Sequence, residues 1–595
     1  MINQDEIKEK ISLRHGGDEK QLEVICSEAN KLIVEAPAGF GKTNTMVSKI
    51  AYMIASNQIP TPKKMLALTF SVNAAYKIKK DVLKEIPNIL DGHNFKINDK
   101  LYVSNYHGFS RSILRKHGYL LDNNLQNINI FRSVDDSRIE DNVGYGLEQT
   151  EAKILSDFNQ YVKNSNGEKV NEKTEEYNSI VISKLLPQNI IPYNAILTLT
   201  IKLLRDNVNI LNFYKKYYVS ILVDEFQDTN FLSWTLLHQF IHENEQLKLI
   251  FLGDSLQRIY GFIGAVPNLI NRVKDLYQMN LIKLDKNYRF KDNQQMLLLD
   301  SNIRNNAENP RSPTIQEPAN IYFKWLIDQY NESLHIINKV NKIIADYGNV
   351  KVAILTKSRS RNIDAIINEF STQNIPHFYA LFTDEDPNYI KFNKDCLSNF
   401  IEILKDDLIV NKSKLNKLVR TIKELYKDEV NVIFESLIKL LEIFKEKIFS
   451  DFAFLSVEEK INLIKDTFGS NGLKQYIEFV DANVIFSTIH GAKGLEWDYV
   501  ILPDMEAFAF PNYYGLCGSC SPQSKQSCNL QVTSDIEAKF LEELSVFYVA
   551  VTRARKQVYF SASQKQINSS GNEVARNISC FMRLSGINIV NDNDD

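Results

Sequence analysis

The sequence predicts an α/β protein with buried strands, and three observations support this fold class. Residues 32–34 (LIV) form a short apolar run, followed by a loop with two glycines and a segment with helical spacing. Residues 221–223 (ILV) form a second such run, which ends in two carboxylates. The stretch 350–360 (VKVAILTKSRS) is again an apolar run followed by polar residues. Continuous apolar runs of this length are typical of strands covered on both faces.

Length and composition indicate an ordinary globular protein of several domains. The 595 residues exceed one hydrophobic core and suggest about four domains. The apolar content of 44% and the charged content of 24% are those of globular proteins. The net charge is −3, from 70 basic and 73 acidic residues, so no global positive field indicates nucleic acid. A basic groove inside a neutral protein would still be enough to bind a phosphate backbone.

The chain shows no pattern typical of export or membrane insertion. Its N-terminus, MINQDEIKEKIS, lacks the apolar core of a signal peptide. No apolar run approaches the length of a spanning helix, about 18 residues. Six cysteines in so long a chain do not make a disulfide scaffold. We therefore expect a reducing, cytoplasmic setting and no membrane partner.

The loop 36-APAGFGKT-43 has the pattern of a phosphate-binding P-loop in its required context of strand, glycine loop and helix. The helix is indicated by apolar residues at helical spacing, namely Met46, Val47, Ile50 and Ile54. Gly39 and Gly41 let backbone N–H groups turn toward the phosphates. Lys42 supplies a charge for the β and γ phosphates, and Thr43 a hydroxyl for Mg²⁺. A plain glycine-rich turn is the alternative, but the flanking elements favour ATP or GTP binding.

Asp224 and Glu225 follow the second apolar run directly. Asp224 can hold Mg²⁺ through water, and Glu225 can orient and deprotonate the attacking water. A lone Asp-Glu pair would be interpreted as an acidic surface turn. Because a buried strand and a P-loop accompany this pair, a nucleotide hydrolase is favoured over a kinase.

The segment 224-DEFQD-228, together with the P-loop, resembles motifs II and I of the UvrD/Rep/PcrA family of superfamily 1 DNA helicases. The family's further motifs are matched in order, so that the resemblance covers residues from about 18 to 565. The matching segments are Gln21 in 18-DEKQLEVI-25 (Q motif), Leu66–Ala75 (motif Ia), Val103–Leu114 (the next motif), 251-FLGDSLQRIYGFIGA-265 (motif III), Leu284–Phe290 (motif IV), Phe486–Met505 (motif V) and Glu542–Arg555 (motif VI).

The resemblance implies two RecA-like parallel-sheet motor domains, each with a mainly helical inserted subdomain. About 180 residues separate the P-loop from Asp224, more than one such sheet needs. The expected boundaries are 1–114 and 206–283 for the first motor domain, 115–205 for its insertion, 284–395 and 483–595 for the second motor domain, and 396–482 for its small helical insertion. Within the first insertion, the polar stretch Lys163–Ser179 predicts a mobile loop.

The resemblance also implies ATP and Mg²⁺ as cofactors. Gln21 would read the adenine, Tyr288 would stack on it, and Glu496 would contact the ribose. Thr43 and Asp224 would hold the Mg²⁺. The expected ATP-binding loop comprises Ala36, Pro37, Ala38, Gly39, Phe40, Gly41, Lys42, Thr43 and Asn44.

The expected catalytic residues come from both motor domains. Gln257 would sense the γ-phosphate and report it to the DNA-binding surface. Arg289 and Arg553 would act as arginine fingers, a role that can be worth a factor of about 10³ to 10⁵ in rate. The full catalytic set implied is Lys42, Asp224, Glu225, Gln257, Arg289 and Arg553.

The expected DNA surface is aromatic and polar rather than basic. By resemblance it is a single-strand track lined by Phe70, His107, Tyr260, Phe262 and His490. Bases stack on aromatic faces at roughly 1–3 kcal/mol each, without sequence readout. Taken alone, such a Phe or Tyr would be interpreted as core packing and such a His as internally hydrogen-bonded, so motif position carries this prediction.

Several positions depart from the family pattern. The family usually has Trp-Arg before the Gly-Ala of motif III, where this chain has Phe262 and Ile263. Ile263 cannot form the ion pair that couples the ATP site to DNA. Leu544 and Ser545 replace arginines of motif VI, and Asn44 replaces the arginine that often follows GKT. Hydrolysis should survive these changes, whereas coupling to translocation is in doubt.

Two functional hypotheses follow. The first is a 3′-to-5′ single-stranded DNA translocase and helicase that acts on single-stranded or 3′-tailed DNA. The second is a DNA-stimulated ATPase that serves as a sensor or regulatory subunit for a nuclease partner, as in a bacterial anti-phage defence system. The sequence leaves the pathway open between repair, replication restart, recombination and defence.

Three cysteines lie close together between motifs V and VI, at Cys517, Cys520 and Cys528. Their spacing suggests a zinc knuckle, but a tetrahedral site needs four ligands. Cys396 or Cys580 could supply the fourth only through the fold. A zinc site and a reduced loop both stay open.

Overall fold

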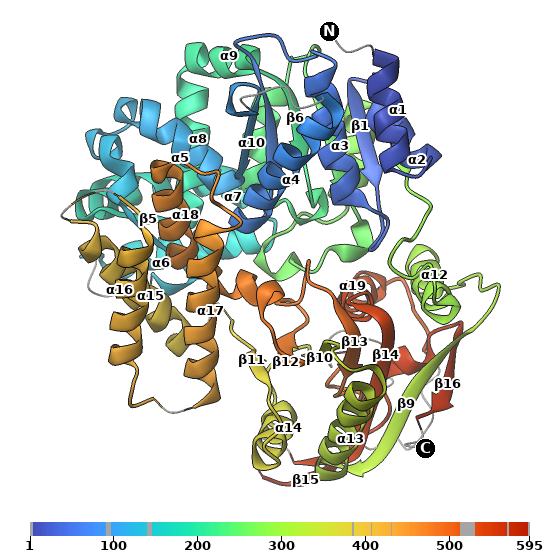
Figure 1. Ribbon diagram of the computed structural model, residues 1–595. Coiled ribbons are helices and arrows are strands. Elements are labelled where there is room, and N and C mark those ends of the chain that lie inside the picture. Colours follow the sequence, from blue (N-terminus) through green and yellow to red (C-terminus); the bar gives the residue numbers. More distant parts are fainter. Residues whose placement is uncertain are drawn as a thin grey trace. The chain divides into compact units, whose positions relative to one another are not determined.

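The computed structural model divides the chain into two compact units, Met1–Lys286 and Asn287–Asp595 (Figure 1). The residues that it describes are 4–90, 97–139, 146–383, 386–405, 407, 409–429, 431–511, 530–567 and 571–592. Both units combine a parallel sheet with many helices, which confirms the α/β fold class. The finer division into motor domains and insertions stays a prediction.

The first unit is built on a six-stranded parallel sheet with strand order β3-β2-β6-β7-β1-β8. Its strands are β1 (Lys31–Glu35), β2 (Lys64–Thr69), β3 (Leu101–Asn105), β6 (Tyr218–Val223), β7 (Lys248–Gly253) and β8 (Asn280–Lys283). Alternate side chains enter two separate cores, with Ile33 and Leu66 in one and Leu32 and Met65 in the other. The apolar runs are therefore continuous because both faces are covered.

Helices cover both faces of this sheet (Figure 1). One core is completed by α1 (Gln4–Arg14), α2 (Glu19–Cys26), α3 (Lys42–Ala55) and α4 (Val72–Leu90). The other is completed by α5 (Tyr106–His117), α6 (Gln149–Lys163), α7 (Gly167–Ile180), α8 (Tyr193–Asp206), α9 (Val208–Tyr217), α10 (Phe231–Ile241) and α11 (Leu269–Tyr277). A small parallel pair, β4 (Arg132–Val134) and β5 (Ile190–Pro192), lies outside the main sheet.

The prediction of a mobile loop at Lys163–Ser179 is wrong, because α7 occupies most of that stretch. Val170 and Tyr177 are seven residues apart, which places them on one helical face, and both are buried. The ring of Tyr177 stacks on Phe158 of α6 with 4.1 Å between centroids. Its hydroxyl donates to Asp136 Oδ1 at 2.5 Å. The buried side chains of Val170 and Tyr177 hold α7 against its neighbours. The polar residues on its outer face made the stretch look like a loop.

The second unit is built on a sheet with strand order β11-β12-β10-β13-β14-β9-β16, in which every pair is parallel. Its strands are β9 (Ala319–Asp328), β10 (Val352–Thr356), β11 (Phe378–Ala380), β12 (Val484–Thr488), β13 (Trp497–Leu502), β14 (Ala554–Ile567) and β16 (Ile587–Asn591), with β15 (Glu573–Ala575) antiparallel to β14. The helices outside the segment between β11 and β12 are α12 (Gln294–Glu308), α13 (Gln329–Tyr347), α14 (Arg361–Thr372) and α19 (Glu537–Val551).

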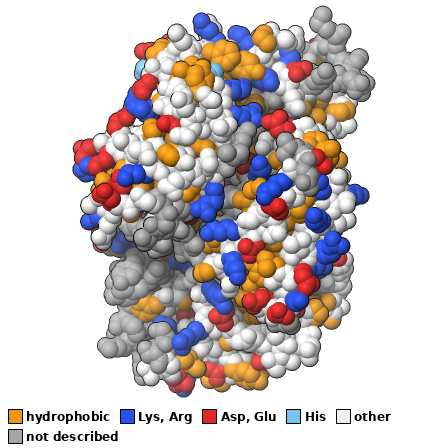
Figure 2. All heavy atoms as spheres, turned by 90° about the vertical axis from the view of Figure 1, so that its left-hand side faces the viewer, with side chains coloured by type: hydrophobic (Ala, Val, Ile, Leu, Met, Phe, Trp, Pro, Cys, Tyr) orange, Lys and Arg blue, Asp and Glu red, His pale blue; other side chains and the backbone are white. Residues whose placement is uncertain are grey.

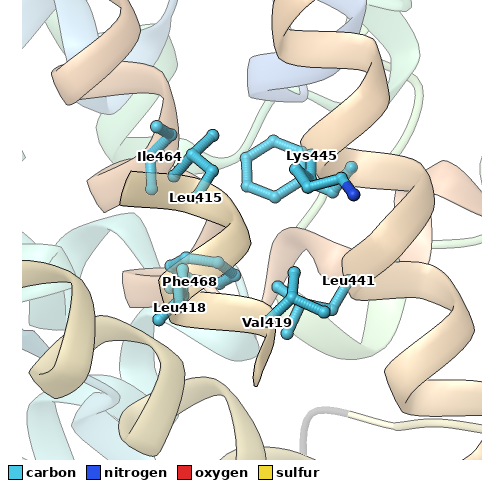
Figure 3. Close-up of a pocket in the computed structure, with 8 residues that line it drawn as sticks. Leu415, Leu418, Val419, Leu441, Lys445, Ile464 and Phe468 are labelled. Atoms are coloured by element: carbon cyan, nitrogen blue, oxygen red, sulfur yellow. The ribbon is translucent and has the colours of Figure 1, made fainter. Parts of the chain in front are cut away.

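Four helices lie between β11 and β12, namely α15 (Pro387–Ile403), α16 (Lys412–Leu425), α17 (Val432–Phe449) and α18 (Val457–Gly469). Apolar side chains of α16, α17 and α18 converge on one another, among them Leu415, Leu441 and Phe468 (Figure 3). The cavity between them is about 10 Å³, room for at most one water. The apolar side chains of these helices therefore pack against one another and leave no room for a larger ligand between them.

No helix in the described ranges is long and apolar enough to cross a membrane. On the face drawn in Figure 2, basic, acidic and apolar side chains all reach the surface. This mixture agrees with the near balance of 70 basic and 73 acidic residues.

Candidate functional site

The P-loop connects β1 to the first residue of α3. Ala36 N donates to the carbonyl of Gly253 at 3.0 Å, which ties the loop to β7. Gly39 and Gly41 have φ of 85° and 80°, in the left-handed region that favours glycine. The loop leads directly into the N-terminus of α3, and backbone N–H groups at a helix N-terminus are suited to anions. The backbone thus has the form of a phosphate cradle.

Lys42 is the first residue of α3, and its side chain is buried with carboxylates around it. Its Nζ lies 2.5 Å from Glu225 Oε1. Burial alone would lower the pKa of Lys42, but Glu225 and Asp224 outweigh it, and the pKa is raised. Lys42 therefore stays positively charged, and its ammonium group can leave the Glu225 carboxylate for a nucleotide phosphate.

Asp224 and Glu225 follow β6 at the same edge of the sheet as the P-loop. Glu225 adopts φ 52°, and its N–H donates to Asp224 Oδ1 at 3.0 Å. Burial raises the pKa of Asp224 to about 6, with Lys42 opposing the rise and Glu225 adding to it. A buried Asp224 and a half-buried Glu225 beside the P-loop suit Mg²⁺, whose preferred ligands are oxygens.

A hydrogen-bond chain connects Glu225 to Gln257. Gln227 Nε2 donates to Glu225 Oε2 at 2.5 Å, and Gln227 Oε1 accepts from Asp254 N at 3.1 Å. Gln257 Nε2 then donates to Asp254 Oδ2 at 2.7 Å. A Cβ on Gly253 would lie 2.7 Å from Gln227 Oε1, so this series of hydrogen bonds needs a glycine at position 253. We term this connection the Glu225–Gln257 chain.

Sequence reasoning missed Gln227 and Asp254. Both lie inside quoted motifs, Gln227 in DEFQD and Asp254 in GDSLQ, so the signal was present. Their role as connectors depends on β6 and β7 being neighbours in the sheet, which the motifs do not state.

Gln21 and Asn44 lie beside the P-loop and contact the end of α1. Gln21 is buried, and its Nε2 donates to the carbonyl of Phe40 at 3.2 Å. Asn44 Oδ1 accepts from Arg14 Nη2 at 3.1 Å. An arginine from α1 thus contacts the position where the family often has its own arginine.

Three of the five expected DNA-binding side chains form an exposed aromatic cluster in the first unit. Phe70 and Tyr260 are stacked, with 4.7 Å between centroids and 12° between planes. Phe262 lies 6.3 Å from Tyr260 and is 62% exposed. His107 packs edge-on against Tyr193 of α8 at 5.7 Å, and burial lowers its pKa to about 4, so it is neutral.

The turn that carries Tyr260, Phe262 and Ile263 is held by the connection between α6 and α7. Ser165 Oγ donates to the carbonyl of Gly264 at 3.1 Å. A Cβ on Gly264 would lie 2.5 Å from the carbonyl oxygen of Val162. The turn that carries Tyr260 and Phe262 is therefore packed against a helical segment. Ile263, in the same turn, is half-buried.

In the second unit, arginines gather around Glu496. Arg289 hydrogen-bonds the Glu496 carboxylate and the carbonyl of Thr552. Arg553 is buried, and its Nε donates to the carbonyl of Val549 at 2.9 Å. Burial would raise the pKa of Glu496, but Arg289 and Arg553 lower it overall. Arg555, which sequence reasoning did not assign, bonds Glu496 through Nε at 3.2 Å.

The remaining expected residues of this unit are more dispersed. Tyr288, which precedes Arg289 in the sequence, is 44% exposed. His490 follows β12 and is half-buried. Leu544 is fully buried, and Ser545 Oγ donates to the carbonyl of Leu541 at 2.7 Å. The two positions where the family has arginines are therefore buried positions of α19.

The candidate zinc ligands Cys517, Cys520 and Cys528 lie outside the described residues. Cys396 and Cys580 are both buried. Within the described ranges, no group of three or more His, Cys, Asp or Glu residues could hold a metal ion.

Two family models match the chain, the UvrD/REP helicase N-terminal domain over residues 18–278 and the UvrD-like helicase C-terminal domain over residues 391–565. A probable DNA helicase II homolog of Rickettsia conorii is 24% identical over 95% of this chain and 94% of its own. The ATP-dependent DNA helicase PcrA of Leuconostoc citreum is 22% identical over 92% and 82%. The ATP-dependent DNA helicase Rep of Buchnera aphidicola is 24% identical over 90% and 93%. The similarity thus extends far beyond the P-loop.

Proposed function

Because this chain belongs to the UvrD/Rep family of ATP-dependent DNA helicases, we propose that it moves 3′-to-5′ along single-stranded DNA and separates 3′-tailed duplexes. The observation that carries the proposal is the Glu225–Gln257 chain. It leads from the charge partner of Lys42 to a residue only three positions before Tyr260. A change at the phosphates can therefore reach Gln257 through these hydrogen bonds, and Tyr260 of the aromatic cluster follows three residues later in the sequence.

Nucleotide binding would begin with an exchange of partners at Lys42. The P-loop N–H groups and Lys42 would hold the phosphates, while Thr43 and Asp224 would hold Mg²⁺, which neutralises phosphate charge when bound. Lys42 would then leave Glu225. Glu225 would become free to accept a proton from the attacking water. In this proposal the Lys42–Glu225 ion pair keeps the base occupied until nucleotide arrives.

The second unit would complete the catalytic set. Arg289 and Arg553 would stabilise charge on the γ-phosphate, with Tyr288 and Glu496 contacting adenine and ribose. Arg289 is bonded to Glu496 in the structure, so it too would exchange a carboxylate for a phosphate. We propose that hydrolysis requires catalytic residues from both units.

DNA would bind on the aromatic cluster of Phe70, Tyr260 and Phe262. Exposed rings accept any base, so the contact would be independent of sequence. Loss of the γ-phosphate contact at Gln257 would shift the turn that carries Tyr260 and Phe262. Movement along the strand would result from alternation between the two arrangements.

A second function is favoured by Ile263. This residue is apolar and half-buried at the position where the family usually has an arginine that couples hydrolysis to DNA. A motor with weakened coupling could hydrolyse ATP on DNA ends and act through a nuclease partner. Such a subunit would suit genome defence, whereas an independent helicase would suit repair.

Strand displacement by the purified chain tests the proposal. Unwinding of a 3′-tailed duplex, with no unwinding of a matched 5′-tailed duplex and none by Lys42→Ala, would support the helicase. DNA-stimulated ATPase without displacement, together with a co-purifying nuclease, would support the regulatory subunit. Absence of ATPase in the presence of single-stranded DNA would contradict both.

A further inference from the structure

His15 follows α1 and contacts Gln21, the residue proposed to read the adenine. Its Nδ1 is hydrogen-bonded to Gln21 Oε1, and its Nε2 lies 2.9 Å from Ser48 Oγ on α3. Both residues are buried, with 6% of His15 and 2% of Gln21 exposed. His15 precedes residue 18, where the family match begins, so no motif assigns it a role.

The contacts of Gln21 decide which way its amide points. An amide can be placed in two orientations that exchange oxygen and nitrogen. One end faces the carbonyl oxygen of Phe40 at 3.2 Å, and a carbonyl only accepts, so the nitrogen lies there. The oxygen therefore faces His15, whose Nδ1 must carry a proton. Nε2 can then accept from Ser48, and burial lowers the pKa of His15, which favours this neutral ring.

An amide in this orientation distinguishes purines. Adenine presents an amino donor at N6 beside an acceptor at N7, whereas guanine presents acceptors at both O6 and N7. The oxygen of Gln21 can accept from an adenine amino group while its nitrogen donates to N7. Against guanine, the same oxygen would face O6 without a proton between them.

We propose that His15 is a positioning residue that locks the amide of Gln21 in the orientation that selects adenine nucleotides over guanine nucleotides. The proposal rests on the proposed ATP hydrolysis and on the role that the family resemblance implies for Gln21, namely reading the base. His15 acts through Gln21 and need not contact the nucleotide.

The surroundings of His15 hold its ring in place before any nucleotide binds. Arg14 connects the end of α1 to α3 through Asn44 at 3.1 Å and to α4 through an ion pair with Glu85. The chain then turns through Gly16 and Gly17, which have φ of 57° and 70°. The carbonyl of His15 accepts from Asp18 N at 3.1 Å. Both the backbone and the ring of His15 are thus fixed by neighbouring elements.

The test compares nearly isosteric variants. His15→Asn keeps an N–H donor near the Nδ1 position, whereas His15→Leu fills similar space without a donor. The measurement is kcat/KM for ATP and for GTP with saturating oligo(dT), using the full chain. We expect His15→Leu to lower the ATP:GTP preference roughly 3- to 10-fold, mainly through the KM for ATP, as for one ordinary hydrogen bond. His15→Asn should retain most of the preference, and His242→Ala, at an exposed histidine, should retain all of it.

A double variant separates positioning from packing. If His15 acts through Gln21, His15→Leu should add nothing to the loss caused by Gln21→Ala. An additive loss, or an unchanged preference in His15→Leu, overturns the proposal for His15 alone. An unchanged preference in Gln21→Ala removes base reading by Gln21 and the role of His15 with it. Equal losses in His15→Asn and His15→Leu would also overturn the proposal, because the donor would not matter.

Discussion

Asp224 is buried, and burial disfavours the charged form of its carboxyl group. Burial raises its pKa to about 6, and the opposing effect of Lys42 does not cancel this rise. The folded protein therefore binds a proton at Asp224 more tightly than the unfolded chain does. Stability from this group is present below its ordinary pKa of 3.8 and is lost as the pH rises through about 6. Such a carboxylate gains most from a bound cation.

Asp224→Asn should therefore stabilise the first unit near pH 7.5 while abolishing ATP hydrolysis. The expected gain is about 1–3 kcal/mol, because the buried negative charge is removed. The gain should shrink as the pH falls through the ordinary pKa of 3.8 and vanish by about pH 3, where the wild-type aspartic acid is neutral in both the folded and the unfolded chain. Calorimetric unfolding of nucleotide-free protein across this pH range measures it. Asp157→Asn, at an exposed carboxylate, is the control, and an unchanged or lower melting temperature for Asp224→Asn would contradict the prediction.

At the scale of elements, α7 shows how few side chains are needed to order a polar segment. Tyr177 connects α7 to α6 by ring stacking and to Asp136 by its hydroxyl. Asp136 is buried and also accepts from Asn194 N at 3.0 Å. The exposed face carries pairs such as Lys169 and Glu172 at 2.7 Å, which contribute little because both partners are solvated. The helix therefore depends on its inner face.

Tyr177→Phe should destabilise α7 without emptying its packing site. Asp136 loses one of its donors, at a cost of about 1–3 kcal/mol. Amide hydrogen exchange across residues 167–180 should accelerate relative to wild type. Lys173→Ala, on the exposed face, should leave exchange of the inner residues nearly unchanged. A stretch that exchanges without protection in the wild-type protein would show that α7 does not form.

The turn Gly261–Ile263 is a second element whose role can be isolated. Phe262 is exposed on it, next to the stacked pair of Phe70 and Tyr260. Phe262→Ala should weaken single-stranded DNA binding by roughly 1–3 kcal/mol, because one stacking face is lost. ATPase measured without DNA should be unchanged. Phe213→Ala removes another exposed phenylalanine, 54% accessible on α9, and should leave affinity for fluorescent oligo(dT) intact. Equal effects of the two substitutions would argue against a specific track.

At the scale of the whole molecule, the expected catalytic residues are divided between two compact units. Lys42, Asp224 and Glu225 lie in the first unit, and Arg289 and Arg553 lie in the second. Each group is preorganised within its own unit, by the Glu225–Gln257 chain in one case and by Glu496 in the other. A function that requires both groups would make hydrolysis depend on the arrangement of the units.

Arg289→Ala should lower DNA-stimulated kcat by about 10³-fold, because an arginine finger contributes mainly to the transition state. Binding of a fluorescent ATP analogue should weaken much less, since the phosphate cradle lies in the first unit. Arg311→Ala is a matched control, because Arg311 is exposed in the second unit and pairs with Glu537 at 2.7 Å. A similar loss in analogue binding and in kcat would instead indicate a ground-state contact.

Local features of the fold could be predicted from sequence because they depend on neighbouring residues. The apolar runs at 32–34, 221–223 and within 350–360 became β1, β6 and β10, and the helical spacing after the P-loop became α3. The prediction failed at Lys163–Ser179, where a few buried side chains, those of Val170, Tyr177 and Asn178, oppose a strongly polar composition. The expected roles of the site residues stay predictions.

The sequence by itself determined the α/β class, the phosphate cradle and the family, since strand–loop–helix order and motif order are written along the chain. Only the tertiary structure decided what connects these parts. Gln227 joins Asp254 because β6 and β7 are neighbours in the sheet, and His15 meets Gln21 because the chain turns back after α1. Contacts of this kind depend on how distant elements pack, and no local pattern records them.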